Sequence, residues 1–509
     1  MRMPSKPSSY QSDEPLIKTK RTIAKNLGIL MGSQFVTWGL TLLLTVFLAR
    51  YLGASAMGKL YLADSLWAIV AMFMNFGIDT LLVKEVARTP AKTAELLGTT
   101  IRLRGLLGAV AFGMLALYVH VAGYSSGTLY VVYIIGIAGF ISQLGEACRA
   151  VLQGLERMEY IALSTITSKA FTTFVSIGLL LLGQGLPVIA AVTIASALIY
   201  LLTQIFPLHR LHKLDLRCDE HFGVWLIKAS FPYFIMSILL AGYQQMDAII
   251  ISLLVHEAMV GWYGAAVKLF GAFLFIPVLF VTAVVPTLAR MHAGASQSGP
   301  SLMRKSFELL LVIAVPIGLG VVVLADSLVL LLFGDGFAKS GPVLAVLGLT
   351  LIFTYQNVLL GQFLISTDRQ DGLTVLIGLG MLATIALDIV LVPWCQKTFD
   401  NGAIGGALAY VITEAGIFIG CLRLLPKGIF GWDQVRLYAQ VLLVGLIMLV
   451  TTWWLRHLFI AIPIVFGVVT YVGLLVLLRL LPQGDWPVLK DLGKDALARL
   501  GMGKPAADW

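Results

Sequence analysis

The chain has 509 residues, of which 59% are hydrophobic and 12% charged, and its mean hydropathy is +0.91. Soluble domains carry about 25% charged residues, so this composition excludes an ordinary water-soluble enzyme or binding domain and indicates a polytopic membrane protein. The net charge of +9 does not indicate nucleic-acid binding, because the cations are concentrated in the segments that separate apolar runs on one predicted side of the membrane.

Fourteen apolar segments are long enough to cross a bilayer, whose core of about 30 Å needs about 20 helical residues. The first follows a polar, basic tail at residues 1–26 and is too long for the apolar part of a cleaved signal peptide. The fourteen predicted spans are 27–49, 60–82, 103–119, 128–147, 161–182, 186–206, 230–255, 262–286, 307–331, 342–365, 373–393, 403–424, 437–456 and 458–480.

The distribution of lysine and arginine predicts the orientation of these spans. With the N-terminus in the cytoplasm, the inside segments hold 29 of the 36 Lys and Arg residues, the outside loops hold 5, and Lys169 and Lys268 lie within spans. Cytoplasmic loops carry such an excess of cations, and one missed span would invert every later loop. The count therefore predicts fourteen spans with both termini in the cytoplasm.

A weak internal repeat divides the predicted spans into two halves. A shift of 202 residues places Ala56 on Ala258 and Tyr61 on Tyr263, and it places span two on span eight with the same direction across the membrane. Two parallel six-helix halves around a central cavity are typical of transporters that work by alternating access. The predicted parts are a basic cytoplasmic tail, an N-terminal half, a cytoplasmic linker, a C-terminal half, helices 13 and 14, and a cytoplasmic tail, at 1–26, 27–206, 207–229, 230–424, 425–480 and 481–509.

The chain has no residue spacing typical of a catalytic or metal site. Its four cysteines lack CxxC or zinc-like spacing, its seven histidines are scattered, and its glycine-rich segments lie at or within spans rather than between a strand and a helix. Close helix packing in a bilayer explains the abundance of glycine. The sequence therefore predicts no enzyme activity, no cofactor and no metal site.

Five of the ionisable side chains inside predicted spans are candidates for function, because a charge there is costly and normally faces a cavity or a partner. Lys169 and Glu414 lie near mid-depth, and Lys268 lies six residues from the predicted outer end of span eight. Asp247 lies in the outer part of span seven, and Asp388 lies close to the outer end of span eleven. These residues are candidates for a substrate cavity or for coupling to an ion.

Each of these side chains also has a structural interpretation. Lys268 either lines a cavity or snorkels to the outer interface, and Lys169 either lines a cavity or forms an ion pair. Asp247 is either a coupling residue or the counter-ion of Lys268. Glu414 is either a protonated acid held by packing or a proton-coupling site, because burial disfavours a charged carboxylate.

Six segments follow one another in the order expected for a known family. They are LGASAMGKLYLADSL, FGIDTLLVKEVAR, RAVLQGLERMEY, SFPYFIMSILLAGYQQMDAIIISLL, VGWYGAAVKL and NGAIGGALAYVITE. In these segments the chain resembles the Wzx-type oligosaccharide flippases, which form the polysaccharide-biosynthesis branch of the multidrug and oligosaccharidyl-lipid exporter (MATE-like) superfamily. The resemblance covers roughly residues 20–480, nearly the whole chain.

The resemblance implies an all-α, V-shaped bundle of two six-helix halves, followed by two C-terminal helices. It also implies a flippase that moves an isoprenoid-diphosphate-linked oligosaccharide from the cytoplasmic to the periplasmic leaflet of the bacterial inner membrane, for synthesis of lipopolysaccharide or exopolysaccharide. Lipid-linked oligosaccharide and membrane lipids are then the partners, with polysaccharide polymerase and chain-length proteins as further ones. A monomer that binds no nucleic acid is expected.

An anionic, sugar-rich head group would need cations and amphipathic side chains in the cavity. The chain supplies seven candidates for these contacts: Lys169, Lys268, Arg50, Tyr243, Gln244, Gln245 and Tyr263. For the tyrosines and glutamines, interfacial anchoring and helix packing are the alternative.

Three other functions fit the sequence less well. A multidrug/cation antiporter of the same superfamily usually has twelve spans and acidic residues for a cationic drug. A lipid II flippase has fourteen spans, but the early cluster of arginine and aspartate associated with it is not evident around Arg50 and Asp64. A membrane glycosyltransferase needs an acidic motif in a large outside loop, and the predicted outside loops are about ten residues or shorter.

Overall fold

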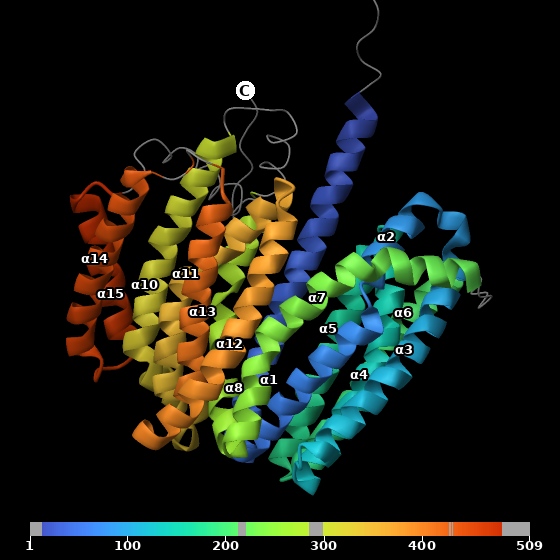
Figure 1. Cartoon of the computed structure of the whole chain (residues 1–509), viewed down its shortest axis with the longest axis horizontal. Coiled ribbons are helices and arrows are strands. Elements are labelled where there is room, and N and C mark those ends of the chain that lie inside the picture. Colours follow the sequence, from blue (N-terminus) through green and yellow to red (C-terminus); the bar gives the residue numbers. More distant parts are fainter. Residues whose placement is uncertain are drawn as a thin grey trace, which may run out of the picture. The chain divides into compact units, whose positions relative to one another are not determined.

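The computed structural model describes residues 13–211, 220–282, 299–426 and 431–480, with residues 284 and 429. All regular elements in these ranges are helical (Figure 1). They are α1 Asp13–Asn75, α2 Ile78–Arg88, η1 Pro90–Lys92, α3 Thr93–Val121, α4 Ser126–Gly154, α5 Met158–Leu181, α6 Leu186–Leu211, α7 Glu220–Leu254, α8 Glu257–Phe273, α10 Gly299–Phe333, η2 Asp335–Phe337, α11 Ser340–Ser366, α12 Gln370–Phe399, α13 Ala403–Leu424, α14 Trp432–Leu455 and α15 Ala461–Leu477.

The number of crossing helices agrees with the sequence. Twelve helical stretches in the described ranges are long and apolar enough to cross a bilayer. The first of them contains two spans, because α1 is interrupted at Gly53, and α15 is a shorter apolar helix of 17 residues. Together they make fourteen segments, which confirms the predicted all-α polytopic fold.

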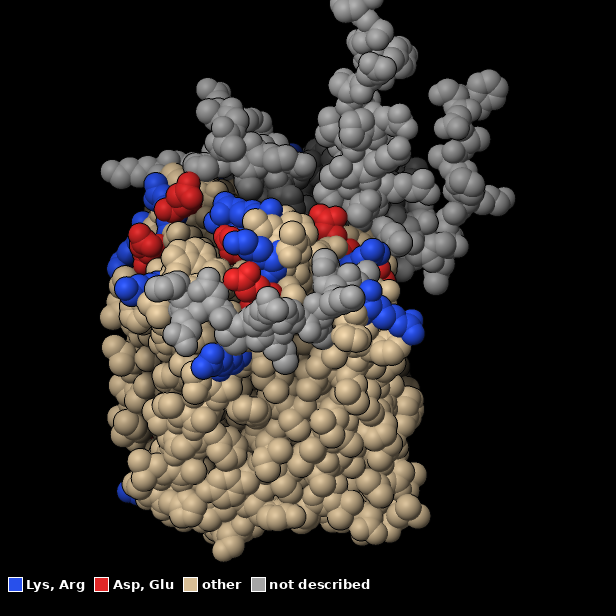
Figure 2. Space-filling view, turned by 90° about the vertical axis from the view of Figure 1, so that its right-hand side faces the viewer, with Lys and Arg blue, Asp and Glu red and all other residues tan. Residues whose placement is uncertain are grey.

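The surface has the distribution of charge that a bilayer requires. On the face in Figure 2, the Lys, Arg, Asp and Glu side chains gather at one end, and the remaining surface is almost free of charge. Large apolar side chains such as Leu117 and Val465 are exposed on the helices, at 68% and 61%. An apolar surface of this extent needs contact with lipid.

Two backbone breaks shape the first helices. Gly53 has φ 78° and ψ 178°, a conformation that glycine alone adopts readily, so the two spans of α1 meet without a loop. The helix α1 ends at Asn75, because Phe76 and Gly77 have φ of 48° and 73°. Predicted span two, 60–82, was therefore too long at its end, since Ile78 begins the separate helix α2.

A buried arginine holds the break between α1 and α2. Arg104 of α3 is completely buried, and its guanidinium donates to the carboxylate of Asp79 on α2 and to the main-chain oxygen of Gln143 on α4. Asn75, the last residue of α1, donates from Nδ2 to Asp79 at 3.1 Å. One ion pair and its hydrogen bonds thus tie four helices together.

The described residues pack as two compact units. Unit 1 lies within Met1–Ala272, Val329–Val343 and Ile377–Thr413, and unit 2 lies within Phe273–Leu328, Leu344–Leu376 and Glu414–Trp509. A hydrophobic core of unit 1 forms where α2, α3, α4, α5, α6 and α7 meet, and one of unit 2 forms where α10, α11, α14 and α15 meet. The two six-helix halves stay a prediction, because these units group the helices differently.

Helices extend into segments that the sequence assigned to tails and linkers. The helix α1 begins at Asp13, within the predicted tail 1–26, and α6 and α7 reach Leu211 and Glu220, within the predicted linker 207–229. Polar residues can continue a helix beyond the bilayer, since its backbone hydrogen bonds are already paired. The predicted tail segments 1–12 and 481–509 lie outside the described residues.

The two segments that the internal repeat aligns lie against each other in unit 1. A Cβ atom at Gly58 of α1 would lie 2.1 Å from the main-chain oxygen of Glu257 on α8. A Cβ atom at Gly261 of α8 would lie 1.9 Å from the main-chain oxygen of Ala54 on α1. Backbone therefore touches backbone, which only small residues permit.

Glu257 ties three helices together at the same place. Its carboxylate accepts hydrogen bonds from Thr128 at 2.6 Å, Ser125 at 3.0 Å and Ser55 at 3.2 Å, and it pairs with Lys59 at 3.3 Å. Here the starts of α4 and α8 meet α1 just after its break. We call this end of unit 1, marked by Gly53, Ser125 and Glu257, the Gly53 end.

Replacement of Gly261 by alanine is expected to destabilise the protein by about 1–3 kcal/mol, because the new methyl group would overlap the backbone of α1. The measurement is the thermal unfolding midpoint in detergent. Gly271, on the same helix, has no atom within 4 Å of its Cβ position, so Gly271→Ala is the matched control and should leave the midpoint unchanged or slightly raised. Equal midpoints for both variants would contradict the close contact.

Arg104→Ala is expected to cost about 3–5 kcal/mol, because it removes the buried cation that pairs with the largely buried carboxylate of Asp79. Arg102 is exposed on the same helix, and Arg102→Ala should change stability by less than about 0.5 kcal/mol. Protease resistance and thermal unfolding of the two purified variants would measure the difference. A stable Arg104→Ala protein would show that the ion pair does not hold the break.

Candidate functional site

Three charged side chains lie at one depth in unit 1. Asp64 is 11 residues after Gly53, Lys268 is 11 residues after the start of α8, and Lys169 is 12 residues before the end of α5. At 1.5 Å per residue, each lies about 16–18 Å from the Gly53 end, near the middle of a hydrocarbon core of about 30 Å. We call these three residues the lysine site.

The members of the lysine site interact electrostatically. Lys268 Nζ lies 3.9 Å from Asp64 Oδ2, and the charges of Lys268 and Asp64 both act on Lys169. The side chains of Lys268 and Asp64 are 35% and 53% exposed. Exposed charges at mid-depth are stable when they face a water-filled cavity rather than lipid, so this part of unit 1 is suited to hold a polar ligand.

Lys268 is deeper than the sequence indicated. The helix α8 begins at Glu257 rather than at 262, which adds more than one turn between Lys268 and the Gly53 end. Its ammonium lies 5.9 Å from the centre of the Tyr61 ring, and Gly264 makes room for that ring, since a Cβ there would lie 2.5 Å from Tyr61 Cγ. An aromatic face attracts the cation, so the position favours a cavity residue over a snorkelling one.

Two buried carboxyl groups form a second cluster in unit 1. Asp247 is 3% exposed and accepts a hydrogen bond from the hydroxyl of Tyr263, and Asp388, which is fully buried, lies against Asp247. Within the described ranges, no Lys or Arg acts on either carboxyl. Asp247 is therefore not the counter-ion of Lys268, whose acidic neighbour is Asp64.

Asp388 also lies deeper than its predicted position near the end of span eleven. The helix α12 continues to Phe399, so Asp388 is 11 residues, about 16 Å, from that end. The Tyr263 ring packs edge-on against Tyr61 with centroids 6.3 Å apart. A continuous set of contacts thus runs from the acidic pair through two tyrosines to Lys268.

Arg50 lies at the Gly53 end and not in the lysine site. Its guanidinium donates to the main-chain oxygens of Leu331 and of Leu332, the latter at 2.8 Å, at the C-terminal turn of α10. The last carbonyl groups of a helix lack partners and carry negative potential. Arg50 therefore caps the C-terminal end of α10.

The polar candidates on α7 differ in exposure. Tyr243 is buried with its ring 5.8 Å from that of Tyr410, whereas Gln244 is exposed and Gln245 is half-buried. The two glutamines can therefore reach a ligand more readily than Tyr243 can. No group of three or more His, Cys, Asp or Glu side chains suited to a metal occurs within the described ranges.

Glu414 belongs to unit 2, whereas the residues of the lysine site belong to unit 1. It is 4% exposed, and Asn357 of α11 donates to its Oε2 at 2.7 Å and to its main-chain oxygen at 2.9 Å. Both contacts hold α13 against α11. They favour the packing interpretation of Glu414 over the coupling one.

Asp64 is the member of the lysine site that the sequence did not single out. Predicted span two begins at residue 60, which put Asp64 near the interface, where a charge is ordinary. The sharp break at Gly53 moves the start of that helix back, so Asp64 reaches mid-depth. The sequence signal for this earlier start was Gly53, because an unbroken helical pattern follows it directly.

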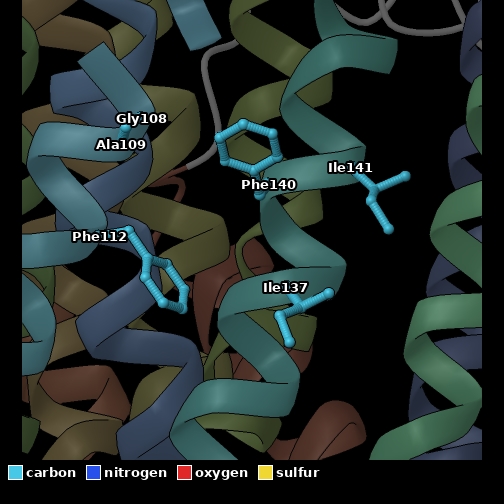
Figure 3. Close-up of a pocket in the computed structure, with 6 residues that line it drawn as sticks. All are labelled: Gly108, Ala109, Phe112, Ile137, Phe140 and Ile141. Carbon is cyan, nitrogen blue, oxygen red and sulfur yellow. The ribbon is translucent and has the colours of Figure 1, made fainter. Parts of the chain in front are cut away.

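An apolar cavity of about 280 Å³ lies between α3 and α4 in unit 1 (Figure 3). It is lined by Gly108, Ala109, Phe112, Ile137, Phe140 and Ile141. This lining contains no polar side chain, so the cavity is suited to hydrocarbon and offers nothing to a charged head group.

Known proteins of similar sequence and structure are membrane transporters. The probable low-salt glycan biosynthesis flippase Agl15 of Haloferax volcanii is 24% identical over 385 residues, which cover 74% of this chain and 78% of that protein. The lipid II flippase MurJ, in an inward closed conformation, matches with a TM-score of 0.71 at 15% identity, over 88% of this chain and 98% of MurJ. An inward-facing MATE-family multidrug resistance transporter matches with a TM-score of 0.63 at 12% identity, over 78% of this chain and 98% of the transporter.

At these identities the structural matches show a shared fold, that of the MurJ and MATE transporters, as the sequence resemblance predicted. The sequence profile described as polysaccharide biosynthesis protein matches residues 23–292, more than half of the chain. This stretch carries both lysines of the lysine site and Asp64. The chain therefore belongs to the polysaccharide biosynthesis protein family.

Proposed function

We propose that this protein is a flippase that moves an isoprenoid-diphosphate-linked oligosaccharide from the cytoplasmic to the opposite leaflet by alternating access. The observation that carries this proposal is the lysine site, which puts two cations at mid-depth beside exposed polar surface. A diphosphate is the part of such a lipid that is hardest to move through hydrocarbon, because a charge in an apolar medium is costly.

The lysine site suits that head group chemically. Each ammonium has three N–H donors and no acceptor, so Lys169 and Lys268 together can bind several phosphate oxygens. The exposed amide of Gln244 and the half-buried one of Gln245 are available to sugar hydroxyls. The isoprenoid tail can stay in lipid, and the apolar cavity between α3 and α4 supplies a surface that fits it.

The contacts at the Gly53 end support an alternating-access cycle. The Glu257 hydrogen bonds and the Gly58–Gly261 contact hold α1, α4 and α8 together there. A large head group could leave towards this end only after those contacts separate. The charge count supports an outside location for the Gly53 end and a cytoplasmic location for both termini. The family resemblance supports a bacterial cytoplasmic membrane.

The acidic pair supports coupling to a proton or a small cation. Two adjacent buried carboxyls, on which no cation of the described residues acts, are unfavourable when both are charged and unpaired. Binding of one positive charge between Asp247 and Asp388 would relieve that cost. The contacts through Tyr263 and Tyr61 give this event a physical route to Lys268.

A lipid II flippase is the second candidate, favoured by the match to MurJ. Its substrate class has the same isoprenoid-diphosphate chemistry, so the lysine site would serve it equally, and the glycan distinguishes the two. A cationic drug is disfavoured as a substrate, because Lys169 and Lys268 would repel it. Polysaccharide polymerase and chain-length proteins are the proposed partners of the oligosaccharide flippase.

Lys169→Ala and Lys268→Ala are each expected to lower translocation at least tenfold, because each removes a cation from the proposed path. The measurement is leaflet-specific labelling of the lipid-linked oligosaccharide in cells that depend on the variant. Lys397, exposed near the end of α12, supplies the matched control, and Lys397→Ala should retain normal translocation. Normal labelling with both site variants would remove the lysine site from the transport path.

Asp247→Asn and Asp388→Asn are each expected to remove the dependence of transport on a proton or sodium gradient, because an amide cannot bind the coupling charge. Glu414→Gln should keep that dependence, since Asn357 already holds Glu414 in a structural contact. Flipping in vesicles with imposed gradients would measure this. Loss of gradient dependence in Glu414→Gln alone would assign coupling to Glu414 instead.

A further inference from the structure

We infer that Asp64 is the resident counter-ion of the lysine site and a specificity residue for the charge of the head group. In this role Asp64 neutralises Lys268 before substrate binds, and the diphosphate then replaces Asp64 as the partner of Lys268. The negative charge of Asp64 also weakens diphosphate binding enough for release. The inference rests on the proposed function and adds a residue and a property that the proposed function does not require.

The contact between Asp64 and Lys268 is loose. The 3.9 Å between Oδ2 and Nζ exceeds the 2.7–2.9 Å of a direct charge-assisted hydrogen bond. Both side chains are partly exposed, whereas the paired Arg104 is completely buried. A partly hydrated ion pair is weak, so an incoming anion can replace Asp64 at little cost.

The charges of the site explain why an internal anion is useful. Lys169 and Lys268 with Asp64 sum to +1, so the empty site is less repulsive than two lysines alone would be. A bound diphosphate would add at least two negative charges beside Asp64. The carboxylate then repels the head group, and this repulsion grows with the head-group charge.

The surroundings let Lys268 exchange partners without losing its position. The Tyr61 ring lies 5.9 Å from the ammonium and is fixed against Gly264 of α8. Tyr61 and Asp64 are three residues apart on α1, so they lie on the same face of that helix. Lys268 can therefore turn from Asp64 towards a phosphate while it stays over the aromatic ring.

Asp64→Asn separates this role from a purely structural one, because loss of a merely structural ion pair would weaken binding. Purified full-length protein in nanodiscs is titrated with a polyprenyl diphosphate and with the polyprenyl monophosphate of the same chain length. We expect Asp64→Asn to bind the diphosphate about tenfold tighter and the monophosphate about threefold tighter than wild type. Release of the diphosphate should slow in proportion.

Glu159→Gln is the matched control. This substitution also removes one negative charge from a partly exposed side chain, which is 44% exposed. Glu159, however, lies ten residues before Lys169 on α5, a distance of about 15 Å along the helix. Its affinities for the diphosphate and the monophosphate should both equal those of wild type.

The double variant tests whether Asp64 acts through Lys268. In a Lys268→Ala background, Asp64→Asn should raise the affinity for the diphosphate about twofold or less, because the cation that Asp64 neutralises is absent.

The outcomes distinguish this inference from the proposed function. Diphosphate binding by wild type with equal or weaker binding by Asp64→Asn overturns the counter-ion role and leaves the flippase proposal standing. An equal gain for diphosphate and monophosphate overturns the specificity role. No binding of either lipid by wild type or variants overturns the proposed function, and the inference with it.

Discussion

A charge cannot remain in hydrocarbon without water or a partner, and this constraint organises unit 1. Three solutions occur in it. Arg104 is buried and paired with the partly buried Asp79, Asp247 and Asp388 are buried together beside a tyrosine hydroxyl, and the lysine site stays partly exposed. Paired and buried charges fix helices, whereas exposed ones at mid-depth are available to a ligand.

Close backbone contact is the second condition on which the lysine site depends. Gly58 and Gly261 let α1 and α8 touch, and the same two helices carry Asp64 and Lys268 about two turns further from the Gly53 end. Larger residues at the glycines would separate the helices and with them the two charges. The packing and the electrostatics of the site are therefore not independent.

The lysine site and the acidic pair share one set of aromatic contacts. Tyr61 touches Lys268 on one side and Tyr263 on the other, and Tyr263 donates to Asp247. A change of charge at the acidic pair would alter the Tyr263 hydrogen bond first. This arrangement places the acidic pair and the lysine site, for which we propose coupling and substrate binding, in one continuous set of side-chain contacts.

The sequence by itself determined the class of protein and the fourteen spans, because hydropathy and cation bias are local properties that survive without tertiary information. Six segments in the expected order indicated the family. It also singled out Lys169 and Lys268, since ionisable residues inside apolar runs are rare. The tertiary structure decided their neighbours: Asp64 rather than Asp247 beside Lys268, and Arg50 on a helix end. Those choices depend on the break at Gly53 and on which helix faces meet, and neither can be read from hydropathy.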